Sequence, residues 1–122
     1  MKTYDHKKIE QKRRTQWAKS GLYRTEEDRT KPKSYILDMF PYPSGEGLHV
    51  GHPKGYIASD IYARFKHMNG HAILHPMGWD AFGLPAEQYA IKNKVHPSAA
   101  VKKNTERYKD QLSQIGFCYD WE

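Results

Sequence analysis

Two histidines three positions apart, His49 and His52, stand in the stretch of the chain best suited to chemistry. They flank Gly51 and follow a segment rich in proline and glycine, Pro41-Tyr42-Pro43-Ser44-Gly45-Glu46-Gly47. Ring N–H groups at the start of a helix would add to its free backbone N–H groups and to the positive end of its dipole, an arrangement that favours phosphate. The stretch therefore predicts an anion site with His49 and His52 as donors, the alternative being two ordinary turn histidines.

Asp80 is a candidate binding carboxylate. It stands in a second block, Gly78-Trp79-Asp80-Ala81-Phe82-Gly83-Leu84-Pro85-Ala86-Glu87. In a partly dry cleft it can pair with the ammonium group of a substrate. Its alternative role is an Asx turn that caps the loop before Gly83.

Both blocks follow short apolar runs that read as strands. The first run is 35–40, ended by Pro41 and Pro43, and the second is 71–75, ended by Pro76. Between them, apolar residues at helical spacing predict a helix that ends near Asn69-Gly70 and buries one face: Val50, Ile57, Ile61, Phe65 and Met68. Strand, helix and strand make a parallel βαβ unit, so both blocks leave the same sheet edge and Asp80 should share a cleft with the histidines.

Three further helices are expected. The first runs from Asp5, a possible N-cap, to about Lys19, and Gly21 ends it. Pro85 suits the first turn of the second, which runs to about residue 93. The third runs from about residue 97 to Gly116, with an apolar face of Val101, Tyr108, Leu112 and Ile115. The fold class is α/β.

Composition restricts the partners. The 122 residues carry a net charge of +6, which suits a nucleotide or nucleic acid or simply solubilises the surface. The single Cys118 excludes an internal disulfide and fits a reducing compartment. The sequence has no membrane span and no signal peptide, so a cytoplasmic location is expected. His67, His71 and His75 are separated by Gly70 and a predicted strand, so no bound metal is expected.

The motif His49-Val50-Gly51-His52 resembles the HIGH signature of class I aminoacyl-tRNA synthetases. With 39–45 and 78–87, it is similar to the N-terminal catalytic region of the bacterial-type leucyl enzymes, over nearly the whole chain. The resemblance implies an incomplete Rossmann-like (HUP-type) nucleotide-binding domain. It divides the chain into an N-terminal helix and surface loop, 1–33, and the N-terminal half of the catalytic domain, 34–122, which ends before the editing insertion.

The resemblance also implies roles. His49 and His52 would be catalytic and would bind ATP together with Pro43 and Gly51, whereas Asp80 would bind the amino acid with Met39, Phe40 and Tyr42. The alternative for Met39 and Phe40 is simple core. The implied reaction joins leucine and ATP, the latter with Mg²⁺ as a substrate complex, and then charges tRNA(Leu). The family's Lys-Met-Ser-Lys-Ser loop is absent here, so this chain without the remaining C-terminal part should be a poor enzyme or none.

Other functions remain open at this stage. One is a class I synthetase for methionine, isoleucine or valine. Another is a non-catalytic nucleotide- or RNA-binding fragment, and a third is a nucleotidyltransferase with the same turn, which the Asp80 block disfavours. The basic residues of the second half could contact a tRNA acceptor end, although a solvated helix face is favoured: Lys92, Lys94, Lys102, Lys103, Arg107 and Lys109.

Overall fold

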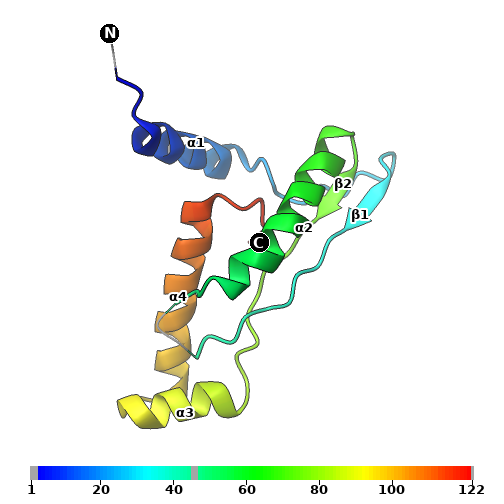
Figure 1. Ribbon diagram of the computed structural model, residues 1–122. Coiled ribbons are helices and arrows are strands. Elements are labelled where there is room, and N and C mark those ends of the chain that lie inside the picture. The colour runs from blue at the N-terminus through cyan, green and yellow to red at the C-terminus, as the bar shows by residue number, and fades with distance from the viewer. Residues whose placement is uncertain (1–2, 45–46, 122) are drawn as a thin grey trace.

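The computed structural model describes residues 3–44 and 47–121 and contains four helices and two strands in the order α1, β1, α2, β2, α3, α4 (Figure 1). The helices are α1 (His6–Ser20), α2 (Gly51–Met68), α3 (Leu84–Asn93) and α4 (Pro97–Ile115). The strands β1 (Lys33–Tyr35) and β2 (Ala72–Leu74) pair in parallel, with Ser34 opposite Ile73. The parallel βαβ unit predicted from the sequence is therefore confirmed.

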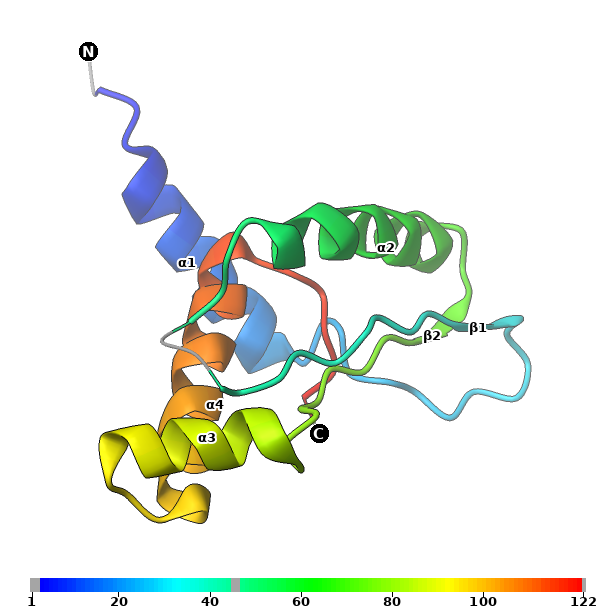
Figure 2. The same ribbon diagram turned by 60° about the horizontal axis from the view of Figure 1, so that its bottom comes forward.

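The strands are shorter than predicted and the first begins earlier. Pairing covers 33–35 rather than 35–40, and one more bond joins the Ile36 N–H to the Leu74 carbonyl (2.9 Å). Pro41 and Pro43 have no N–H to donate, so the ladder cannot continue through them. Residues 36–44 and 75–83 instead run on side by side as irregular chain (Figure 2).

The helix ends lie close to their predicted places. Asp5 caps α1 by accepting a hydrogen bond from the Lys8 N–H (3.1 Å), and Gly21 ends it at φ 60°. Asn69 ends α2, and Gly116 ends α4 at φ 84°, the left-handed region that favours glycine. Local capping chemistry thus set these boundaries.

The buried face of α2 differs from the predicted one. All five residues of the predicted apolar face are exposed, Val50 at 91% and Ile61 at 62%. The buried residues are Tyr56, Asp60 and Ala63. Tyr56 and Asp60 bury their polar groups because these bond to other segments, an outcome that hydrophobic periodicity does not detect.

The predicted face of α4 is only half correct. Tyr108 and Leu112 are buried, but Ile115 is 50% exposed, and the polar Asn104 is buried beside Tyr108. Leu112 and Tyr56 belong to an aromatic-rich core cluster with Met77 and Tyr119. This cluster compensates for the small number of aliphatic residues.

The helix α1 buries none of its residues within the described chain and lies at one side of the molecule (Figure 1). Arg14 holds it by donating to the Gln114 carbonyl of α4 (2.7 Å), and Trp17 packs edge-on against Tyr23. None of the helices in the described part of the chain combines the length and hydropathy that crossing a bilayer requires.

Candidate nucleotide and amino-acid site

The two motif histidines lie together at the first turn of α2. Their ring centroids are 4.0 Å apart, with His49 exposed and His52 half-buried. The Nδ1 atom of His52 accepts a hydrogen bond from the His49 backbone N–H (3.2 Å), and the Nδ1 atom of His49 accepts one from the Gly51 N–H (3.0 Å). With Nδ1 accepting, the neutral rings carry their protons on Nε2. Each histidine thus keeps one N–H donor for a ligand.

His52 favours its neutral form. Burial lowers its pKa below the usual 6.5, and the neighbouring charge of His49 lowers it further, while the hydrogen bond from His49 acts in the opposite direction. At pH 7 His52 therefore acts as a neutral hydrogen-bond donor rather than as a cation.

Gly51 leaves room for the ring of His49. A Cβ atom at position 51 would lie 2.8 Å from the Cε1 atom of His49, closer than real Cβ contacts allow. A side chain there would push the His49 ring away from the Gly51 N–H. The glycine therefore allows the His49 ring to fold back onto the Gly51 N–H, a role separate from leaving room for a ligand.

The segment 39–43 mixes exposed and buried residues. Met39 is 84% exposed and Tyr42 is 52% exposed, whereas Pro43 is fully buried. Phe40 is half-buried and packs on Gly78, where an added Cβ would lie 2.9 Å from its Cε2 atom. Met39 and Tyr42 thus present side chains to the surface, and Phe40 contacts the block that carries Asp80.

Asp80 is exposed, and its N–H donates to the Pro41 carbonyl (3.1 Å), which fixes its loop beside the segment 39–43. The link to the histidines runs through Tyr108 of α4. Its ring meets His52 edge-on at 5.9 Å and Trp79 edge-on at the same centroid distance. The structure thus brings a residue of each predicted block into contact with the same tyrosine.

Comparison with known proteins identifies the family. A sequence profile of the family described as tRNA synthetases class I (M) matches residues 34–121. The chain belongs to the class I tRNA synthetases. The leucine--tRNA ligase of Amoebophilus asiaticus is 61% identical over all 122 residues, and that of Parabacteroides distasonis is 60% identical over 118 residues. The matches cover 13% and 12% of these two proteins, so the chain spans about one eighth of the length of the curated relatives.

Solved structures of class I synthetases agree with this assignment. Agrobacterium radiobacter K84 agnB2 LeuRS, in a ternary complex with tRNA and LeuAMS, matches with a TM-score of 0.91 and 38% identity over 98% of this chain and 15% of its own. Mycobacterium tuberculosis methionyl-tRNA synthetase with methionyl-adenylate matches with a TM-score of 0.69 and 30% identity over 74% of this chain and 17% of its own. The α/β, Rossmann-like fold class expected from the sequence is confirmed.

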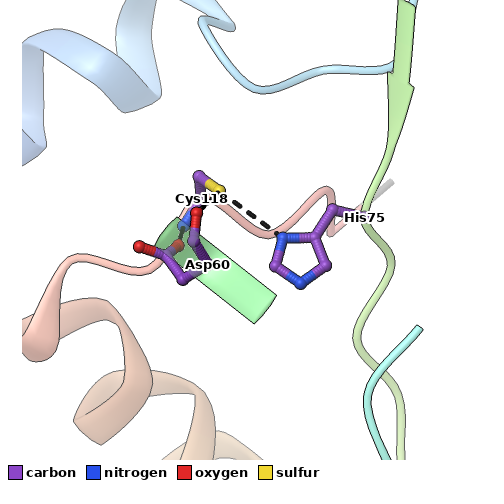
Figure 3. A group of neighbouring side chains, drawn as sticks. All are labelled: Asp60, His75 and Cys118. Atoms are coloured by element: carbon purple, nitrogen blue, oxygen red, sulfur yellow. Dashed lines mark hydrogen bonds between the residues drawn. The ribbon is translucent and has the colours of Figure 1, made fainter. Parts of the chain in front are cut away.

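This class I chain also contains a buried group of metal-type ligands that its sequence did not predict. One ligand-type atom each of Asp60, His75 and Cys118 (a carboxylate oxygen, a ring nitrogen and the sulfur) lies within 4.8 Å of the other two, and the residues come from three separate segments (Figure 3). The His75 Nδ1 atom lies 3.4 Å from the Cys118 sulfur, and the Cys118 N–H donates to Asp60 (2.6 Å). Arg64 donates to the other Asp60 oxygen (2.7 Å).

These contacts fit a structural network better than a metal site. A metal would need the Cys118 thiolate, yet burial raises the pKa of that thiol well above its usual range, and the adjacent Asp60 raises it further. The Arg64 guanidinium already supplies the positive charge beside Asp60. We therefore interpret Asp60, His75 and Cys118 as core hydrogen-bonding residues.

Asp38, inside the first predicted strand, is a further buried polar residue that the sequence analysis did not single out. Its carboxylate accepts hydrogen bonds from the Tyr119 hydroxyl (2.8 Å) and the Ser59 hydroxyl, and His75 Nε2 lies 3.2 Å away. One side chain thus joins the chain before the segment 39–43 to α2, to His75 just after β2, and to Tyr119 near the C-terminal end. The signal in the sequence was a carboxylate inside an apolar run, which has to find buried partners.

Proposed function

We propose that this chain is the part of a leucine--tRNA ligase in which ATP and leucine meet to form leucyl-adenylate. The single observation that carries the proposal is the likeness to leucine--tRNA ligases at about 60% identity over nearly the whole chain. The likeness to the methionyl enzyme is lower, at 30% over 74% of the chain, which disfavours methionine as the substrate.

On this proposal, the leucine carboxylate attacks the α-phosphorus of ATP and pyrophosphate leaves. Negative charge grows on the phosphate oxygens, and the protein contributes mainly position and electrostatic stabilisation. His49 and His52 donate from Nε2 to those oxygens. Gly51 and the Pro43 region border the adenosine, and Mg²⁺ arrives with ATP as part of the substrate.

Leucine lies beside Asp80 and the segment 39–43 in this proposal. Asp80 pairs with the α-ammonium group, which fixes the direction from which the carboxylate attacks. Met39, Phe40 and Tyr42 border the aliphatic side chain. Met39 and Tyr42 support this role by being exposed beside the loop that carries Asp80.

Other parts of the proposal concern the longer protein. Residues 34–122 would form the first half of the catalytic domain, and 1–33 its N-terminal helix and loop. The complete ligase would then transfer leucine to tRNA(Leu) in the cytoplasm, together with the remaining C-terminal part.

Calorimetric titration of the 122-residue chain with non-hydrolysable leucyl-, methionyl- and isoleucyl-adenylate analogues tests the site. We expect the leucyl analogue to bind most tightly and the Asp80→Asn variant to lose at least about tenfold in affinity, since a hydrogen-bonded ion pair contributes roughly 1.5–3 kcal/mol. Asp110→Asn, an exposed aspartate on α4, is the matched control and should bind like the parent chain.

Equal binding of all three analogues would contradict leucine as the substrate and leave only an adenosine site. The absence of any binding by a chain whose circular dichroism shows the helix content of the four helices would contradict the proposal that this segment forms the site itself.

A further inference from the structure

Three residues on one face of α4 contact the chain around the histidine motif: Asn104, Tyr108 and Gln111. Their spacing of four and then three residues places them on the same side of the helix. The predicted turn that leads into the motif begins at Pro43 and ends at Leu48. The Asn104 side-chain amide donates to the Pro43 carbonyl (2.8 Å), at the start of the turn. The Gln111 side-chain carbonyl accepts from the Leu48 N–H (2.8 Å), at its end. One helix face thus holds both ends of the turn.

The Asn104 contact is built into the core rather than added at the surface. Asn104 is 2% exposed, and Pro43 is among the most deeply buried residues of the described chain. A buried amide is costly without partners, so its position at the Pro43 carbonyl is strongly determined.

The Gln111 contact depends on a glycine. Gly47 has a φ of 143°, in the region that side chains avoid, and a Cβ atom there would lie 2.6 Å from the Gln111 Oε1 atom. The amide of Gln111 therefore occupies the space that any other residue at position 47 would need. The absence of a side chain at position 47 is therefore what allows Gln111 of α4 to reach the Leu48 N–H.

We propose that Asn104 and Gln111 are positioning residues of the ATP site, an inference that rests on the function proposed above. They fix Pro43 and Leu48, and thereby the direction in which the chain enters α2. This direction decides where the Nε2–H donors of His49 and His52 point. Tyr108, between them on the same face, supports the His52 ring from the side. Asn104 and Gln111 themselves act through the turn and not on the nucleotide.

The first test measures the hydrogen-exchange rate of the Leu48 amide by NMR in the 122-residue chain. In Gln111→Leu, which removes the acceptor, we expect the amide to exchange about fivefold faster, the effect of one ordinary hydrogen bond. Gln111→Glu keeps an acceptor oxygen and should restore the protection. Gln114→Leu, one turn further along α4 and exposed, is the matched control and should leave Leu48 unchanged.

The second test compares the affinities for ATP and for leucine in the same variants. We expect Gln111→Leu to weaken ATP binding about fivefold and to leave leucine binding unchanged, because only the phosphate side depends on the turn. Asn104→Asp, which places an oxygen against the Pro43 carbonyl, should produce the same one-sided loss. A general loss of structure would instead lower the affinities for ATP and for leucine equally.

Leu48 exchange that is the same in Gln111→Leu and in the parent chain overturns the inference. So does an equal loss of ATP and leucine affinity in folded variants. A parent chain that binds neither ligand overturns the proposed function, and in that case the Leu48 exchange rates still decide whether Gln111 holds the turn.

Discussion

The ion pair between Asp60 and Arg64 should be one of the main stabilising contacts of this chain. Both residues lie on α2, with the Arg64 Nε atom 2.7 Å from an Asp60 oxygen, and their side chains are 28% and 12% exposed respectively. Arg64 also donates to the Tyr23 hydroxyl (2.6 Å) and to the Gly116 carbonyl. Asp60 accepts from the Cys118 N–H with its second oxygen. The pair therefore fastens α2 to the loop after α1 and to the end of α4.

Asp60→Asn tests this contact with almost no change of shape. The amide oxygen can still accept from Cys118, but its NH₂ group then faces the Arg64 N–H as a second donor. Breaking a buried pair in this way typically costs about 3–5 kcal/mol. Arg64 is partly exposed and keeps its other partners, so water and those bonds reduce the expected loss to about 2–3 kcal/mol.

Urea unfolding followed by circular dichroism measures the loss, and a melting curve should shift by roughly 6–15 °C in a domain of this size. Asp110→Asn is the matched control, because its carboxylate is exposed and accepts from the likewise exposed Gln114 side chain (2.8 Å). We expect that control to change the free energy of unfolding by less than about 0.5 kcal/mol. A loss below about 1 kcal/mol in Asp60→Asn would refute the reasoning, because the network would then be incidental to stability.

Three further predictions concern the site. The His52 ring should titrate below pH 6.5 in an NMR titration, and a midpoint above 6.5 would contradict this. Because burial lowers the pKa of His52 in the folded chain, its contribution to stability is present above pH 6.5 and is lost as the pH falls through the folded pKa. Gly51→Ala should displace the His49 ring and reduce ATP affinity about tenfold with little effect on leucine, as calorimetry would reveal. Gly78→Ala should press on Phe40 and destabilise the chain by about 1–3 kcal/mol in urea, whereas Gly55→Ala, which has open space around it, should not destabilise it.

The sequence predicted those features that neighbouring residues determine. Asp5, Gly21 and Gly116 end their helices through local hydrogen bonds and backbone conformation, so their positions could be predicted. The parallel pairing of the two strands followed from the length of the connection between them. The order of the elements and the fold class are therefore contained in local patterns.

Features that depend on distant partners could not be predicted in this way. Asp60 is buried because Cys118, 58 positions away, donates to it, and no window around Asp60 contains this information. The apolar stripe of α2 suggested a different face, since periodicity reports only which residues are apolar and not which surface meets the rest of the chain. His49, His52 and Asp80 were proposed from the motifs, but Tyr108, which contacts His52 and Trp79, was predicted only as a core residue of α4.

The segment 39–43 explains why so many of the missed residues are polar. Its prolines remove N–H groups, so it cannot join a sheet, yet its carbonyls still require donors. In extended chain alternate carbonyls point the same way. Those of Met39, Pro41 and Pro43 accept from the Tyr56 hydroxyl (2.9 Å), the Asp80 N–H (3.1 Å) and the Asn104 amide (2.8 Å).

These three donors come from α2, from the loop after β2 and from α4. Each of these three elements therefore donates one hydrogen bond to the backbone of the segment 39–43. A shift of one element would move the part of the segment that it holds: α2 and the loop after β2 hold Met39 and Pro41 beside the residues proposed to bind leucine, and α4 holds Pro43 on the side proposed to bind ATP. The absence of sheet pairing in this segment is what gives side chains of distant helices control over the position of the site.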